Sequence, residues 1–254
     1  MAEQQAMNRA DDLRRLYELL DHLKERHGGT RTLAQLDQHR DWPSRGVYFF
    51  FEPGEVRSES GTGQRLVRVG THALTDGSRS TLRQRLAQHR GLRSGDGNHR
   101  GSIFRLLVGQ ALLADRNLDV CPSWGVKGDA GKAATLLGVG RDVIRATEEP
   151  VEREVSERLW AMPFLWLRIE DAPGPSSTRG FVERNCIALV SNYQRDHVDA
   201  PSQSWLGHNS NRPHVRGSGL WNQRHVDEEH DPKFLALFEQ LVRAQEARPP
   251  VEEP

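Results

Sequence analysis

The stretch that decides the fold is Gly46-Val47-Tyr48-Phe49-Phe50-Phe51. A second apolar run follows it in the sequence, Leu66-Val67-Arg68-Val69-Gly70. Both runs are rich in aromatic and β-branched side chains, which is typical of buried strands. The segment between them, residues 52–64, holds one proline and three glycines among charged residues. This composition predicts a hairpin loop that joins two strands.

A helix follows this hairpin over residues 80–90 and ends at Gly91. Its helical spacing turns Leu82 and Leu86 inward and sets Arg85 and His89 along the adjoining edge of the same face. Further helices are predicted over residues 8–26, 102–113, 131–146, 152–158 and 181–193, and after Asp231-Pro232; a further strand is predicted over residues 162–169.

These elements predict an α+β fold with a small mixed or antiparallel sheet of about three or four strands, flanked by helices. Helical additions are expected at both ends. The predicted organisation is a helical extension at 1–45, a core at 46–195 with an insertion around 115–150, a C-terminal loop and helix at 196–247, and a disordered tail at 248–254.

Composition excludes several classes of protein. The chain has 254 residues, 36% of them hydrophobic and 28% charged, and a mean hydropathy of −0.70. No run approaches the ~20 apolar residues that span a membrane, and the first residues do not resemble a signal peptide. Cys121 and Cys186 match no metal-binding spacing. We therefore expect a cytoplasmic protein without a membrane segment.

Charge is balanced overall but not locally. The chain has 35 basic and 35 acidic residues, so net charge alone does not favour nucleic acid. Between Arg79 and Arg105, however, seven arginines stand against the single acid Asp96. A local basic patch of this kind can steer a phosphate ligand, although most such runs are simply solvated faces.

At these residues the sequence resembles the GIY-YIG nuclease superfamily. Gly46-Val47-Tyr48 resembles the family's first tripeptide, and Arg68-Val69-Gly70 resembles the second. Arg85 and His89 resemble the arginine and histidine of the family's first helix. Glu183 falls on a later helix, after a strand, where the family keeps its metal-binding glutamate. The order and spacing of these features carry the resemblance more than either tripeptide does.

The resemblance implies metal-assisted hydrolysis of a phosphodiester bond in DNA. Tyr48 is expected to act as general base or to orient the attacking water, and Arg85 to stabilise charge at phosphorus. Glu183 would hold one Mg²⁺ or Mn²⁺ ion. His89 would relay a proton or contact phosphate, and Asn192 would complete the site.

The second tripeptide begins with Arg68, where the family has tyrosine. A tyrosine hydroxyl is protonated at neutral pH, so a cation beside Tyr48 would favour its phenolate. Arg68 therefore either supports Tyr48 or marks a scaffold that has lost activity. Taken alone, each site residue has a plainer explanation, such as core packing for Tyr48 and a helix-dipole partner for Glu183.

Nucleic-acid contacts are expected from arginines in two segments, 79–105 and 205–226: Arg83, Arg93, Arg100, Arg105, Arg212 and Arg216. The second segment also holds Trp205 and Trp221, which either stack on nucleic acid or pin the loop to the core. Its histidines match no zinc pattern.

The prediction is a divalent-metal-dependent DNA endonuclease, with a restriction-type enzyme as one biological role that the sequence leaves open. The alternative is a non-catalytic nucleic-acid-binding protein on a degenerate nuclease scaffold. The sequence does not separate DNA from RNA or branched substrates, and it leaves the oligomeric state open, with a homodimer as one alternative.

Overall fold

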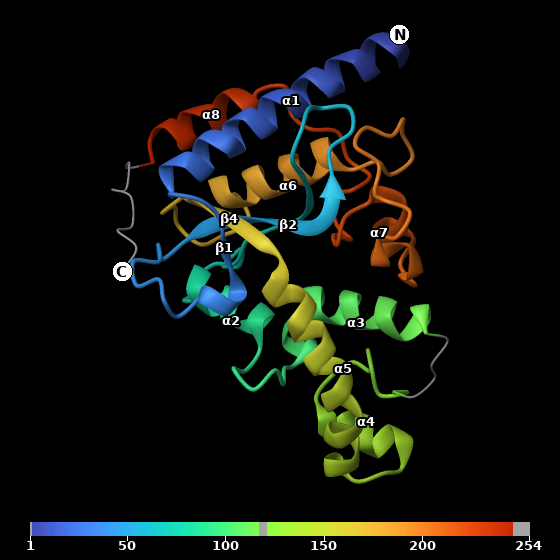
Figure 1. Cartoon of the computed structure of the whole chain (residues 1–254). Coiled ribbons are helices and arrows are strands. Elements are labelled where there is room, and N and C mark those ends of the chain that lie inside the picture. Colours follow the sequence, from blue (N-terminus) through green and yellow to red (C-terminus); the bar gives the residue numbers. More distant parts are fainter. Residues whose placement is uncertain (1, 117–120, 246–254) are drawn as a thin grey trace.

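The computed structural model describes residues 2–116 and 121–245 (Figure 1). Its centre is an antiparallel sheet with the strand order β1-β4-β2-β3. The strands are β1 (Arg31–Thr32), β2 (Gly46–Val56), β3 (Gln64–Gly70) and β4 (Pro163–Arg168). The predicted α+β class with a small antiparallel sheet is confirmed. The tail predicted at 248–254 lies outside the described residues.

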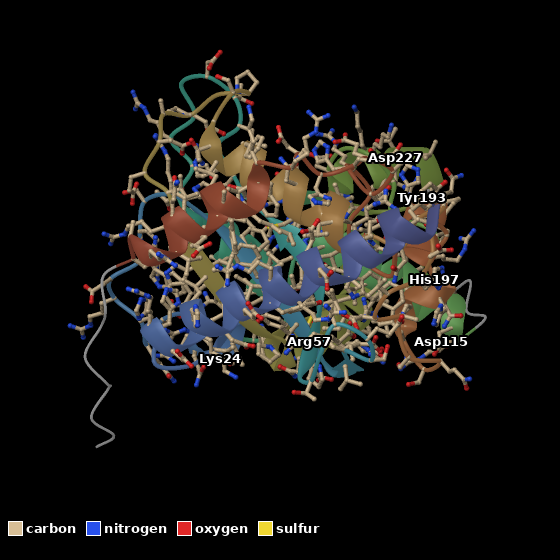
Figure 2. The ribbon with its side chains drawn as sticks, turned by 90° about the horizontal axis from the view of Figure 1, so that it is seen from above. Lys24, Arg57, Asp115, Tyr193, His197 and Asp227 are labelled. Carbon is tan, nitrogen blue, oxygen red and sulfur yellow. The ribbon has the colours of Figure 1, made fainter. Side chains whose placement is uncertain are left out.

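Helices cover both faces of the sheet (Figure 1). One face packs against α1 (Ala2–Arg26), α6 (Thr178–Val190) and α8 (Phe234–Arg243). The other packs against α2 (Leu82–Arg90), α3 (Ile103–Asp115) and α5 (Arg141–Ala161). The shorter elements are η1 (Leu33–Gln35), η2 (His99–Gly101), α4 (Ala130–Leu137), η3 (Leu206–Asn209) and α7 (Pro213–Ser218). Figure 2 looks down on the first layer, where α1 and α8 pack together and Lys24 projects from α1.

Strand alternation builds the two cores. In β2, Val47 and Phe49 join the core under α1, whereas Tyr48 and Phe50 join the core under α2 and α3. Successive side chains of a strand point to opposite faces, so a strand covered on both sides must be apolar throughout. This requirement explains the unbroken apolar run from residue 46 to residue 51.

Hydroxyl side chains set the starts of the helices that carry the predicted site. The Oγ1 atom of Thr81 accepts the backbone N–H of Gln84 at 3.2 Å and begins α2. Ser102 begins α3 in the same way, and Ser177 begins α6. Such caps satisfy N–H groups that the first turn leaves unpaired. They fix the rotation of each helix and therefore the face on which its functional residues lie.

The segment around 115–161 differs from its prediction. The sequence predicts two separate helices at 131–146 and 152–158, with Pro150 between them. The structure instead has a short α4 and then α5, which runs without interruption from Arg141 to Ala161 through Pro150. Proline removes one backbone N–H donor and crowds the carbonyl four residues before it, and tertiary packing of the helix offsets these costs.

The segment 205–226 is pinned to the core. Trp205 and Trp221 are buried, and both indole N–H groups donate to one carboxylate oxygen of Glu52, at 3.1 and 3.0 Å. Of the two alternatives for these tryptophans, the structure therefore supports the structural one. Across the part of the chain that the structure describes, none of the helices is long and apolar enough to cross a membrane.

Candidate active site

Tyr48 lies on β2 directly opposite Gly70 of β3. A Cβ atom at residue 70 would overlap the phenol ring and hydroxyl of Tyr48. A second glycine, Gly46, faces the backbone carbonyl of Leu167 in β4, and a Cβ atom there would lie 2.5 Å from that oxygen. The two glycines of the motif therefore make room for the Tyr48 ring and for close strand packing.

The Tyr48 hydroxyl belongs to a buried hydrogen-bond chain. Its Oη atom lies 2.8 Å from Nε2 of His89, and Nδ1 of the same ring lies 2.7 Å from Oγ of Ser102. Ser102 Oγ also accepts the Arg105 backbone N–H at 3.3 Å. Because the cap of α3 fixes Ser102, it also fixes the imidazole ring and the direction of the phenol hydroxyl.

His89 is held in its neutral form. Burial lowers the pKa of its imidazole well below the usual value, and the nearby cations Arg85, Arg68 and Arg105 lower it further. His89 is also fully buried, with 0% of its surface exposed. A neutral, buried imidazole can orient the phenol, but it does not reach a bound phosphate directly.

Arg68 stands at the centre of the site. Its guanidinium donates to the Trp221 carbonyl, lies 4.7 Å from the centre of the Phe104 ring, and interacts electrostatically with Tyr48 and Glu183. Within the described residues, no carboxylate lies within ion-pair distance of it, and its buried Nε atom has no hydrogen-bond partner. Burial lowers the pKa of Arg68, yet arginine remains charged at any working pH.

Arg85, which interacts with both Arg68 and His72, and His72 itself each have an unsatisfied buried atom in the described part of the chain. Nε of Arg85 and Nδ1 of His72 are buried and, among the residues described, have no hydrogen-bond partner. Burial lowers the pKa of His72 to about 4, with contributions from Arg179, Arg45 and Arg85. Nε2 of His72 donates to the Ser44 carbonyl at 3.2 Å, so in the neutral ring Nδ1 is an acceptor, and the free donors are the Nε atoms of Arg85 and Arg68. Buried donors are rarely left unpaired in a structural role, so these two guanidinium groups favour a site for an anion.

Glu183 reaches the end of β3 from α6. Its Oε1 atom accepts the Thr71 backbone N–H at 3.1 Å. Burial raises the pKa of Glu183, opposed by Arg68 and His225. The side chain is partly exposed, unlike the fully buried His89. Glu183 is therefore a carboxylate that both faces Arg68 and has access to solvent.

The donor set around Glu183 fits Mg²⁺ or Mn²⁺ but not an all-protein metal cage. Residues 2–116 and 121–245 contain no cluster of three or more His, Cys, Asp or Glu side chains arranged to hold a metal. Mg²⁺ usually keeps several waters and binds one or two carboxylates together with substrate phosphates. A single partly exposed carboxylate beside two arginines meets that requirement.

Asn192 lies away from this cluster. Its amide bonds Val198 in both directions, at 3.1 and 3.0 Å, and its Oδ1 atom accepts Arg9 at 2.8 Å. The side chain is 2% exposed. These contacts fix the turn that follows α6. Within the described residues, Asn192 therefore makes no hydrogen bond with Glu183 and is linked to it only by the chain of α6.

The predicted DNA-binding arginines divide into three groups. Arg105 is 0% exposed, and Nε and Nη2 both donate to Glu152, at 2.8 and 2.6 Å. Arg100 forms a bidentate pair with Glu148, at 2.6 and 2.7 Å. Contrary to expectation, the structure thus does not bring Arg105 to the surface, because its donors serve the contact between α3 and α5.

The other four arginines are exposed. Arg83 and Arg93 share the Asp37 carboxylate, at 2.9 and 2.8 Å. Beside them is an open hollow of about 350 Å³, lined in part by Arg90 and Trp160. Arg212 and Arg216 lie in the other predicted segment.

Sequence reasoning missed Ser102, His72 and Asn222. Ser102 was visible as a helix start, but its hydrogen bond to His89 was not. His72 follows Gly70 by two residues and gave no periodic signal. Asn222 bonds both backbone groups of Val69, at 3.2 and 2.9 Å, and so covers the open edge of β3.

Comparison with known proteins agrees with this geometry. The family model described as the GIY-YIG domain matches residues 7–248. Searches of curated proteins and of solved structures each returned no match. The matched range covers nearly the whole chain and includes every element that surrounds Tyr48. The chain therefore belongs to the GIY-YIG nuclease superfamily.

Proposed function

We propose that the protein is a divalent-metal-dependent endonuclease that hydrolyses phosphodiester bonds of DNA. The observation that carries this proposal is the meeting of Tyr48, Arg68, Arg85 and Glu183 at the end of β3, with unpaired guanidinium donors between them. A phenol, two cations and one carboxylate provide a base, an anion site and a metal ligand.

Tyr48 is the proposed general base, in its phenolate form. Arg68 places a positive charge beside the Tyr48 oxygen. Neutral His89 donates its Nε2 proton to that oxygen, while the Ser102 hydroxyl donates to Nδ1. In this arrangement the water gives its proton to Tyr48, attacks phosphorus, and leaves the imidazole neutral throughout.

Arg85 and Arg68 bind and stabilise the phosphate. Both have a buried Nε donor without a partner among the described residues. Guanidinium groups donate paired hydrogen bonds to phosphate oxygens, and these bonds strengthen as negative charge grows on the transition state. Glu183 would hold the metal ion, which stabilises the leaving oxygen when bound.

DNA contacts are proposed for Arg83, Arg93, Arg212 and Arg216, which are exposed. Arg83 and Arg93 share one carboxylate, so their cluster retains net positive charge. Arg100 is mostly buried and paired with Glu148, so we expect it to contribute less to DNA binding than the four exposed arginines do. Asn192 is proposed only to position α6 and, through it, Glu183.

The test is cleavage of plasmid and linear DNA by the purified protein with Mg²⁺ or Mn²⁺, with a chelator as control. We expect cleavage with metal and none without it. Glu183→Gln should lose at least a hundredfold in rate. Glu18→Gln, on the exposed surface of α1, is the matched control and should cleave as the wild type does.

The outcomes separate the alternatives. Discrete fragments would indicate the sequence specificity of a restriction-type enzyme. Salt-sensitive DNA binding without cleavage under any metal would contradict the proposal and favour a non-catalytic protein, which the substitution of Arg68 for the family's tyrosine would then explain. Cleavage of RNA alone would contradict the choice of DNA.

A further inference from the structure

The outer arm, defined as residues 127–147, includes α4 and the first part of α5. It projects from the body of the molecule, at the end of α5 remote from the sheet (Figure 1). A small core of its own, formed by Ala133, Ala134 and Ile144, holds its two helices together. The arm therefore presents a folded surface rather than a loose loop.

Apolar side chains are concentrated at the tip of the outer arm. Leu136 is 72% exposed, Val143 54%, Val139 42% and Leu137 37%. These are four of the eight large hydrophobic side chains that are exposed in the described part of the chain. Single exposed apolar residues are ordinary, but a group around one turn marks an interaction surface.

The same surface carries an excess of cations, one of which, Arg141, interacts electrostatically with Asp129. Lys127, Lys132, Arg141 and Arg145 are all exposed, and within the described ranges none of them makes an ion pair. The outer arm has only two acidic residues, against these four basic residues. One of them, Asp129, accepts the backbone N–H of Lys132 at 2.9 Å and caps α4.

The inner half of α5 shows the opposite arrangement. Four of its five glutamates are paired with an arginine: Glu148 with Arg100, Glu149 with Arg153, Glu152 with Arg105, and Glu154 with Arg116. Glu157 and Arg158 are exposed and lie next to each other, so the inner half carries little net charge, whereas the arm carries an excess of cations. This separation is typical of a surface that meets a polyanion.

Continuous helix connects the outer arm to the active site. Glu152 on α5 binds Arg105, whose Nη1 atom donates to the His89 carbonyl at 3.0 Å. Arg141 lies eleven residues before Glu152, a rise of about 16 Å at ~1.5 Å per residue. That distance is about five base pairs at ~3.4 Å each. A 20-base-pair duplex is about 68 Å long, several times this rise along α5.

We propose that the outer arm binds the DNA duplex that flanks the cleavage site. Its four cations contact phosphates, and the apolar tip packs against the sugars of a groove. This inference rests on DNA being the substrate, as in the proposed function. It assigns a role in substrate binding to a segment remote from the chemistry.

The experiment measures the affinity of a fluorescent 20-base-pair duplex by anisotropy, over a range of salt concentrations. The full chain carries Glu183→Gln in every sample, so that cleavage does not interfere. One variant adds Arg141→Gln and Arg145→Gln. A second adds Leu136→Ser and Val143→Ser. The matched control adds Arg14→Gln and Lys24→Gln, which remove two exposed cations from α1 on the opposite layer (Figure 2).

We expect the arginine variant to raise Kd at least about fivefold and to lower the salt slope by about two, one for each lost phosphate contact. The apolar variant should raise Kd with an unchanged slope. The control should bind as the parent does. Melting curves check that each variant is folded.

DNA binding by the arginine variant that equals the parent overturns the inference and leaves the proposed function intact. A change in sedimentation of the apolar variant, with unaltered DNA affinity, also overturns it and assigns the tip to self-association. Absence of DNA binding by the parent itself overturns both.

Discussion

Arg105 and Arg68 are two buried arginines of similar appearance in sequence, and the regions around them are built differently. Around Arg105, between α3 and α5, the donors meet Glu152, Ser156 and the His89 carbonyl. Around Arg68 there are the Trp221 carbonyl, the Phe104 ring and the Tyr48 hydroxyl, and within the described chain no carboxylate pairs with it.

The difference separates an arginine whose donors are all used in the fold from one that keeps a donor free. A buried cation without a counterion costs free energy of folding, whereas a paired one is at least compensated. Arg105 therefore contributes to the fold. Arg68 costs stability and keeps a donor free, which fits a group that meets an anionic substrate.

The largest effect is expected from Arg105→Ala. This change leaves Glu152 buried without its cation and should lower the free energy of unfolding by about 3–5 kcal/mol. Urea denaturation measures it. Arg184→Ala, at an exposed ion pair with Glu228, is the control and should change stability little. Equal stability of Arg105→Ala and the wild type would contradict the claim that Arg105, unlike Arg68, stabilises the fold.

Arg68→Met should have the reverse profile. We expect the cleavage rate to fall by about 10²–10³-fold, because the cation beside Tyr48 and phosphate is lost. Stability should stay the same or rise, since a buried unpaired charge is replaced by an apolar side chain of similar length. Denaturation and cleavage assays on the same preparation measure both quantities. A large loss of stability with full activity would contradict the assignment of Arg68 to the site.

Gly70→Ala tests the space that the glycine leaves for Tyr48. The added methyl group must displace the phenol, and a misplacement of about 1 Å costs on the order of a hundredfold in rate. Gly101→Ala is the control, because a Cβ atom there lies 3.8 Å from its nearest neighbour, Nδ2 of Asn98. Wild-type kinetics for Gly70→Ala would place the working hydroxyl elsewhere.

Acid should destabilise the protein through the histidines of the site. The folded-state pKa values of His89 and His72 are lowered, to about 4 for His72, whereas the unfolded chain takes up these protons near pH 6.5. Stability is therefore full above about pH 6.5 and falls as pH drops toward 4. The contribution of His72 is on the order of 2 kcal/mol.

Denaturation at pH 7 and pH 4.5 measures this loss for the wild type and for His72→Gln, which can still donate to the Ser44 carbonyl. The variant should lose less stability on acidification. An identical loss in both proteins would mean that His72 is solvated in the folded state.

Much of the fold could be predicted from local patterns. The apolar runs predicted β2, β3 and β4, and the helices predicted over residues 80–90 and 102–113 begin within two residues of α2 and α3. The continuous α5 was not predicted, because the packing that supports Pro150 inside a helix cannot be seen in the sequence.

The structure brings Tyr48, Arg68, Arg85, His89 and Glu183 together at one end of the sheet, and their roles in catalysis stay a prediction. The burial of Arg105 could not be predicted, since its partner Glu152 lies 47 residues away and a run of arginines does not reveal which of them is paired. The same holds for the bond between His89 and Ser102, which depends on how α2 and α3 pack.

Tyr48→Phe tests the central claim most directly, because it removes one buried oxygen and keeps the ring that packs on Phe50 and His89. The measurement is the single-turnover rate of DNA cleavage with Mg²⁺, beside the DNA affinity of the same variant. We expect a rate at least a hundredfold lower with unchanged affinity. Cleavage at the wild-type rate would contradict the claim, because the phenol would then be only part of the core.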